Sequence, residues 1–359
     1  MLIVDAHLDL AMNALQWNRD LLASAYTIRA QENYTPGKGR GVGTVAFPEM
    51  RRGRVALSFA TVIARSTGRP VPHIDFASPA QAHGLGRGQL AYYQALERQG
   101  HIRLIRDASQ LDRHMNEWAA WDGRSAADGR SPAPPLGFVL SMEGADPIVT
   151  PDELETWWQD GLRLIGLSHY GPGRYAGGTG TEFGVSDLGT ALLSEMARLN
   201  VILDLTHCSD EAFWDALDRF DGRVIASHNN CRALVPHQRQ FSDEQIRAIA
   251  AREGVIGAAM DCWMIASGWR HGDSNESVTL ESAVRHIDHI CQLLGTARHV
   301  GIGSDLDGGF GREGSPHDLD TIADLQKIAD LLGQRGYGSN DIAAIMHGNW
   351  WSLLRRAWS

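Results

Sequence analysis

Short apolar and β-branched runs recur along the chain, and each of them ends in a polar loop. Runs of this length, bounded by turn-forming residues, are typical of β-strands. Eight strands are predicted in this way, at residues 2–7, 55–63, 137–143, 163–169, 201–207, 223–228, 254–260 and 299–305.

Amphipathic helices are predicted between the strands, because apolar residues recur there at steps of three and four. Such patterns lie at residues 187–200, 209–220, 277–294, 318–334 and 340–357. Ser78-Pro79 places a proline at a first helical position, and residues 150–153 and 242–245 have the spacing of a capping box.

Strands that alternate with helices form a parallel sheet with right-handed crossovers, and eight such units close into an α/β barrel, the (β/α)8 TIM barrel. An open doubly wound sheet is the structural alternative. We expect one domain over residues 1–359, with insertions near 10–54 and 121–135. The first insertion is either a functional lid or an ordinary connection, and the second is expected to be a surface loop.

The composition indicates a globular protein that acts on a small molecule. The 359 residues carry a formal net charge of −10, which disfavours nucleic acid and an anionic membrane surface as partners. The four cysteines form no CxxC pair, so we expect free thiols in a reducing compartment. The first strand begins at residue 2, and no apolar run approaches the ~18 residues of a spanning helix. A cytoplasmic location without membrane association is therefore expected.

Residues that bind metal ions stand at the carboxyl ends of five predicted strands, where barrel enzymes build their sites. These residues are His7, Asp9, Glu143, His207, His228 and Asp305. Three histidines and three carboxylates exceed the needs of one tetrahedral zinc, but they suit two divalent ions about 3.5–4 Å apart that share a carboxylate. Glu143 is the expected shared residue. A single histidine at a strand end is more often a core residue, so the prediction depends on all six coinciding.

The remaining strand ends carry Arg65, His169 and Asp261. His169 adds a further imidazole to the same end of the predicted barrel. No role is assigned to Arg65 or Asp261 from the sequence.

Several segments resemble the membrane dipeptidase (renal dipeptidase) family, which comprises zinc hydrolases of the amidohydrolase superfamily. The motifs that carry the resemblance are Asp5-Ala-His7-Leu-Asp9, Ser141-Met-Glu143-Gly, Asp204-Leu-Thr-His207, Ala226-Ser-His228, Gly301-Ile-Gly-Ser-Asp305-Leu-Asp307-Gly and His347-Gly-Asn-Trp. Each motif is weak alone, but together they are specific and extend over essentially the whole chain. The segment Met260-Asp-Cys-Trp-Met departs from the family pattern, since it stands where a tyrosine-bearing stretch is expected.

The resemblance implies two divalent metal ions, expected to be Zn²⁺, that share Glu143. One set of ligands is His7, Asp9 and Glu143, and the other is Glu143, His207 and His228.

The resemblance also implies three residues that act on the substrate. Asp305, at the metal site, is implied as the proton carrier, and His169 as the group that stabilises the attacked carbonyl. Arg239, eleven residues after His228, matches the arginine that holds the terminal carboxylate of the substrate. From the sequence alone, a solvated loop residue is the alternative for Arg239.

The function expected from these observations is a binuclear zinc dipeptidase that cleaves dipeptides, including those with a C-terminal D-residue. A binuclear amidohydrolase that acts on another amide, an N-acyl amino acid, a lactone or an ester is the first alternative. A non-catalytic binding module is the second, and the proton carrier argues against it. A homodimer is also expected.

Overall fold

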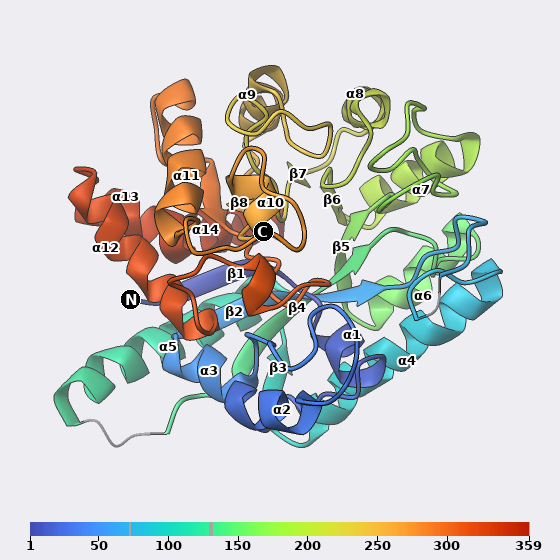
Figure 1. The fold of residues 1–359 in the computed structure, drawn as a ribbon. Helices are drawn as coiled ribbons and strands as arrows, with labels where there is room; N and C mark the ends of the chain where they lie inside the picture. The colour runs from blue at the N-terminus through green and yellow to red at the C-terminus, as the bar shows by residue number, and fades with distance from the viewer. Residues whose placement is uncertain (72, 129–131, 359) are drawn as a thin grey trace.

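The computed structural model describes residues 1–71, 73–128 and 132–358, and a ring of parallel strands enclosed by helices forms its centre (Figure 1). The strands of the ring are β1 (Ile3–Leu8), β2 (Val55–Ile63), β4 (Leu136–Glu143), β5 (Leu162–Gly166), β6 (Ile202–Asp204), β7 (Val224–Ile225), β8 (Ile256–Ala258) and β9 (Val300–Ile302). Their order is β7-β6-β5-β4-β2-β1-β9-β8, and a bridge between Ala226 and Ile256 closes the ring. The prediction of a (β/α)8 barrel is confirmed, and the open sheet is wrong.

A further strand, β3 (Ile102–Leu104), was not predicted from the sequence. It pairs with the start of β4 and stands off the path of the ring. Its three residues are too few to show a period, so nothing in the sequence distinguishes them from a loop.

Helices surround the ring and connect most of its strands (Figure 1). The α-helices are α1 (Leu10–Leu15), α2 (Ala25–Glu32), α3 (Phe47–Arg52), α4 (Pro79–Arg98), α5 (Ala108–Asp128), α6 (Leu154–Gln159), α7 (Asp187–Arg198), α8 (Asp210–Arg219), α9 (Asp243–Ala251), α10 (Cys262–Ile265), α11 (Leu280–Leu294), α12 (Lys327–Gln334), α13 (Ser339–Ala343) and α14 (Asn349–Ala357). Single turns of other helix types lie at Pro151–Glu153, Arg312–Gly314, Ile322–Gln326 and Ala344–Gly348. None of the helices that the structure describes is long and apolar enough to cross a membrane.

The helix starts agree with the sequence at two of three predicted caps. Ser78 accepts a hydrogen bond from the Gln81 amide, and Ser242 forms a complete capping box at the start of α9. The capping box predicted at residues 150–153 is wrong, because Thr150 makes no capping hydrogen bond and the Glu153 carboxylate accepts from the Val149 amide instead.

The segment 121–135, predicted to be a surface loop, is helical in its first part and has no regular structure at residues 132–135. Helix α5 continues through its first part to Asp128, since the alanines and the short polar residues there are compatible with a helix. Residues 129–131 of this prediction lie outside the described residues.

The strands end earlier than predicted, which places several site residues in loops. His169, His207, His228 and Asp305 each lie three residues beyond the last residue of a strand. The backbone of His207 has a φ of 67° and that of Asp305 a φ of 57°, and a strand cannot continue through this left-handed conformation. The sequence therefore located these residues at the correct end of the barrel but assigned them to the wrong type of element.

The long first connection, residues 10–54, is fastened over the carboxyl end of the barrel. Arg19 forms buried ion pairs with Glu32 at 2.9 Å and with Asp307, in the loop after β9, at 3.2 Å. The Asp307 carboxylate also accepts hydrogen bonds from the amides of Thr44 at 2.7 Å and Val45 at 3.0 Å. These contacts hold the connection against the loop that carries Asp305.

Candidate metal centre and substrate cavity

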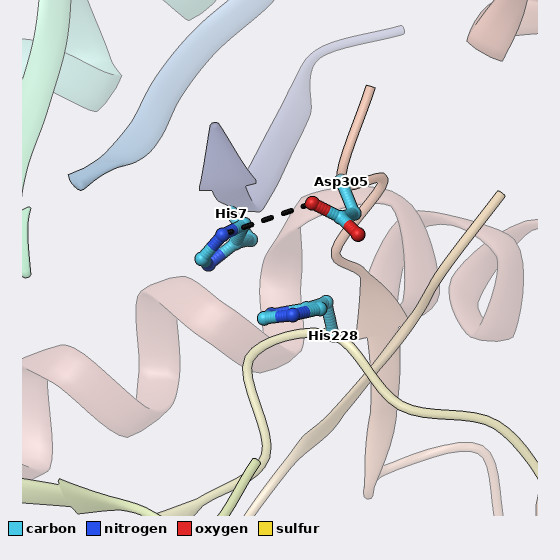
Figure 2. A group of neighbouring side chains, drawn as sticks. All are labelled: His7, His228 and Asp305. Carbon is cyan, nitrogen blue, oxygen red and sulfur yellow. Dashed lines mark ion pairs between the residues drawn. The ribbon is translucent and has the colours of Figure 1, made fainter. Parts of the chain in front are cut away.

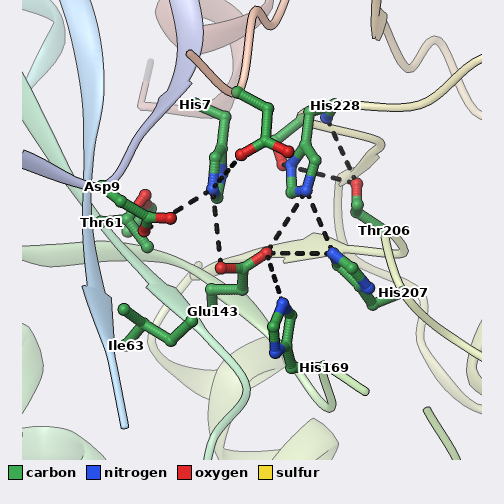
Figure 3. A network of polar contacts seen from close by, with 12 residues as sticks. His7, Asp9, Thr61, Ile63, Glu143, His169, Thr206, His207 and His228 are labelled. Carbon is green, nitrogen blue, oxygen red and sulfur yellow. Dashed lines mark hydrogen bonds and ion pairs between the residues drawn. The ribbon is translucent and has the colours of Figure 1, made fainter. Parts of the chain in front are cut away.

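The candidate site lies at the carboxyl end of the barrel, where side chains from distant segments converge on Glu143. Glu143 is the last residue of β4, and its Oε1 lies 3.2 Å from His207 Nε2 and 3.3 Å from His228 Nε2. Its other oxygen, Oε2, lies 3.6 Å from Nε2 of His7 in β1 (Figure 3). The two oxygens of one carboxylate thus face two different groups of ligands.

Three groups of three residues have ligand atoms within 4.8 Å of one another. They are His7, Asp9 and Glu143; Glu143, His207 and His228; and His7, His228 and Asp305. Figure 2 shows the third group, in which Asp305 Oδ1 lies 3.8 Å from His7 Nε2. All six residues predicted as metal ligands are therefore neighbours in the folded chain.

Two buried atoms of this cluster have no hydrogen-bond partner among the described residues, although they lie 3.8 Å from each other. His7 Nε2 and Asp9 Oδ1 are both shielded from water, and neither makes a hydrogen bond. Leaving such atoms unpaired is costly, so a cation that binds both accounts for their position. Nitrogen and carboxylate oxygen together are ligands that zinc accepts, and the residues present fit a pair of divalent ions.

The two histidines that face Glu143 Oε1 are oriented by hydroxyl groups. The Thr179 hydroxyl lies 3.0 Å from His207 Nδ1 and 3.3 Å from the His207 carbonyl oxygen, so it contacts the ring nitrogen that does not face Glu143. In His228, Nδ1 lies 2.9 Å from the Ser227 hydroxyl. Burial lowers the pKa of both imidazoles well below the usual value, which keeps them neutral and able to bind a metal.

Two carboxylates, neither of them in the predicted ligand set, hold the ligand-bearing loops in place. Asp5 accepts hydrogen bonds from the His7 amide at 3.3 Å and from the Ser304 amide and hydroxyl at 2.8 Å and 2.5 Å, which ties β1 to the loop after β9. Asp204 accepts from the amides of Thr206 and Ser227, both at 3.0 Å. Both carboxylates stand two or three residues before a ligand, and this short spacing is the only sequence signal for them.

His169 lies beside Glu143, and its tautomer is set by Arg65. A guanidinium nitrogen of Arg65 lies 3.3 Å from His169 Nδ1, and since a guanidinium can only donate, Nδ1 must be the acceptor. The ring proton therefore sits on Nε2, which lies 3.7 Å from Glu143 Oε1 (Figure 3). Burial lowers the pKa of His169 to about 4, and the charge of Arg65 contributes in the same direction. His169 is thus a neutral donor that points into the site.

Arg239 is buried, and the solvated loop position considered from the sequence is wrong. Its side chain donates to the Asn229 side chain and, at 2.9 Å, to the His228 carbonyl. Its Nε has no partner among the described residues. Arg239 therefore keeps donor capacity for a ligand, and it lines the same cavity as the metal cluster.

Asp305 stands at the edge of the metal cluster in a strained turn. A Cβ on Gly308 would lie 1.9 Å from Asp305 Oδ1, so only glycine allows the carboxylate to occupy this place. Burial raises the pKa of Asp305 well above its usual value, with Asp9 and Glu143 acting in the same direction. A carboxyl group with a raised pKa can accept and release a proton closer to neutral pH.

A cavity of about 490 Å³ opens above these residues and is large enough for a small ligand. Met12, Gln16, Trp17 and Lys38 of the first connection form part of its wall. Other wall residues come from the loops after the later strands and include Tyr170, Trp263 and His271.

The four cysteines are free, as predicted, and all of them are buried. Cys208, next to His207, is no candidate nucleophile, because burial raises the pKa of its thiol to about 12.

The sequence matches the family model of the membrane dipeptidases, peptidase family M19, over residues 1–358. The chain belongs to this family. The crystal structure of dipeptidase AC, a metallopeptidase of family M19, is similar with a TM-score of 0.75 and 25% identity, and the match covers 100% of this chain and 99% of that one. The same values hold for a metallopeptidase from Rhodobacter sphaeroides that was solved with a phosphinate mimic of the dipeptide L-Ala-D-Ala.

Curated relatives match over shorter segments. Dipeptidase tcpJ of Claviceps purpurea (strain 20.1) is 30% identical over 202 residues, which are 54% of this chain and 44% of that protein. An uncharacterized protein encoded in the pqqA 5′ region of Klebsiella pneumoniae is 29% identical over 233 residues, 62% of this chain and 83% of that protein. The resemblance inferred from the motifs is confirmed, and the protein is a metal-dependent hydrolase of the dipeptidase type.

Proposed function

We propose that the protein is a binuclear zinc dipeptidase that hydrolyses the peptide bond of dipeptides. The observation that carries this proposal is the position of Glu143, whose two oxygens face two separate sets of ligands. One zinc would be held by His7, Asp9 and Glu143, and the other by Glu143, His207 and His228, with Asp305 at the edge of the pair. When bound there, zinc would lower the pKa of a water molecule from about 15.7 to about 7 and so supply a hydroxide nucleophile near neutral pH.

The protein side chains of the cavity have distinct roles in this proposal. The Nε2–H of His169 donates to the carbonyl oxygen of the scissile bond as negative charge develops there. Asp305 takes the proton of the attacking water and passes it to the leaving amine, because its raised pKa allows both transfers. Arg239 binds the terminal carboxylate of the substrate with the donor capacity that the protein leaves unused.

The substrates that we propose include dipeptides with a C-terminal D-residue. This extension is supported by the similar metallopeptidase from Rhodobacter sphaeroides, which was solved with a mimic of L-Ala-D-Ala. The cavity volume also suits a ligand of that size.

The experiment that tests the proposal combines metal analysis with a release assay. We expect about two zinc ions per chain and the release of free amino acids from L,L and L,D dipeptides. Matching N-acyl amino acids keep the amide and the carboxylate but lack the free amino group. Cleavage confined to the acyl compounds, or one metal ion per chain at full activity, would refute the proposal.

A further inference from the structure

Asp261 is a buried acid in the cavity that the proposed reaction does not use. It precedes α10, in the loop after β8, and lines the same cavity as the metal ligands. The residue is 5% exposed, and its Oδ1 has no hydrogen-bond partner among the described residues. Burial raises the pKa of the Asp261 carboxyl to about 7, although the charge of Lys38 and the backbone and indole N–H groups of Trp263 act in the opposite direction. Asp261 therefore lacks the cation that a buried carboxylate normally requires.

Lys38, the protein cation that acts most strongly on the pKa of Asp261, does not pair with it. Lys38 is exposed on the rim of the cavity, and its charge acts on Asp261 only from a distance beyond ion-pair contact. An exposed lysine without a partner costs little, because water solvates it, whereas a buried carboxylate without a partner is costly. The unpaired acid, rather than the unpaired lysine, is thus the feature that calls for a ligand.

The surroundings of Asp261 suit a cationic group. The Trp263 side chain is half-buried and lines the cavity, and the rings of His237 and His271 lie 5.0 Å and 6.3 Å from it. Burial lowers the pKa of both histidines, so they are neutral at neutral pH and do not repel a cation. An ammonium or guanidinium group is attracted by the face of an aromatic ring and also by the negative charge of a neighbouring carboxylate.

The position of Asp261 indicates which part of a dipeptide would reach it. Gln240, the neighbour of Arg239, donates a hydrogen bond of 2.7 Å to the Met264 carbonyl in α10, which ties the loop of Arg239 to the segment of Asp261. Arg239 and Asp261 line the same cavity, so a residue whose carboxylate is held by Arg239 can place its side chain beside Asp261. Lys38 and Glu313, both exposed, are the charged groups with the largest effect on the pKa of Asp261. The α-ammonium of a dipeptide is two bonds from the scissile carbonyl carbon and would stay near the metal ligands instead.

We propose that Asp261 and Trp263 form a subsite for a positively charged side chain on the C-terminal residue of the substrate. The protein would then prefer dipeptides that end in a lysine-like or arginine-like residue. This inference rests on the proposed dipeptidase function and names the substrate class of that same site.

The test compares cleavage of Ala-Lys with cleavage of Ala-norleucine, which has the same carbon chain without the amine. Both substrates are used with an L- and a D-configured second residue. We expect the wild-type kcat/KM to favour Ala-Lys by roughly 10-fold or more for at least one configuration, since a hydrogen bond to a charged group discriminates by this order. Asp261→Asn keeps the shape of the side chain, and we expect it to lower kcat/KM for Ala-Lys by roughly 10–100-fold and to bring the ratio of the two substrates close to one. Asp218→Asn, an exposed position on α8, is the matched control and should leave the ratio unchanged.

The other outcomes each contradict the inference in a distinguishable way. An equal loss for both substrates in Asp261→Asn, at unchanged metal content, would mean that Asp261 holds the α-ammonium or supports the fold. A preference for Ala-Glu that Lys38→Met abolishes would assign the selectivity to Lys38 and an acidic side chain. Equal cleavage of all substrates by the wild type would refute the subsite and leave the dipeptidase function intact. Cleavage of no dipeptide would refute both proposals.

Discussion

Replacing Arg65 tests whether His169 acts as a donor in a fixed tautomer. Arg65 Nη1 lies 3.3 Å from His169 Nδ1, which is at the long end for a hydrogen bond, so its contribution belongs at the lower end of the range for charged groups, about 1.5 kcal/mol. If this hydrogen bond keeps the Nε2–H of His169 directed at the attacked carbonyl, Arg65→Met should lower kcat by roughly 10-fold. KM and the metal content should change little, because Arg65 contacts none of the proposed metal ligands. Arg65→Lys retains a cation that can only donate, and we expect it to restore part of the rate.

The assay is a double-mutant cycle measured by steady-state release of amino acids. His169→Ala removes the donor itself and should lower kcat by roughly 10²–10³-fold, as the loss of an oxyanion donor does. In that background Arg65→Met should have no further effect, because its only route to the reaction has been removed. A further 10-fold loss in the double variant would refute the reasoning. Arg65 would then affect the reaction by a route that does not involve His169. Asp75, whose carboxylate lies 3.5 Å from Arg65 Nε, is one such route.

Three further predictions follow from the site and from the core. Glu143→Gln should lower the occupancy of both metal ions together, as measured by metal analysis after dialysis, and loss of one ion alone would contradict the shared ligand. Arg239→Met should raise KM for dipeptides by roughly 10-fold or more with a smaller change in kcat, and an unchanged KM would remove Arg239 from substrate binding. Burial lowers the pKa of His114 to about 4 from the ordinary 6.5, so the stability that its neutral form contributes is present above pH 6.5 and is lost as the pH falls toward 4. By this linkage the free energy of unfolding should fall by about 2 kcal/mol between pH 7.5 and pH 5 through His114 alone, and His114→Gln should show that much less dependence on pH in urea titrations.

The metal ligands could be predicted from the sequence because the fold itself brings them together. Parallel strands of a barrel place their carboxyl ends on one face, so His7, Glu143 and His228 converge whatever the details of packing. The exact ends of the strands could not be predicted, since the left-handed backbone at His207 and Asp305 depends on contacts such as the close approach of Gly308.

The roles of Arg65 and Asp261 could be inferred only from the structure. Both were recognised at strand ends, but the link from Arg65 to His169 joins loops 104 residues apart in the chain. Asp261 stands out because none of its described neighbours is a cation paired with it. No pattern in the sequence shows how Lys38 lies relative to Asp261. The short strand β3 was missed for a simpler reason, because three residues carry no period.

The number of paired positions differs between neighbouring strands of the barrel, and this difference affects how ligands enter and leave. Strands β2 and β4 pair across seven positions, whereas one bridge, from Ala226 to Ile256, joins β7 to β8 in the part of the chain that the structure describes. We expect the amide protons of β7 and β8 to exchange with solvent faster than those of β2 and β4, which hydrogen-exchange mass spectrometry would show. Local opening there would loosen the side that carries Arg239, Asp261 and the metal ligand His228, while His7 and Glu143 stay on the side with the longer strand pairing. Product release and retention of the metal ion held by His228 would then depend on the same weakly paired contact.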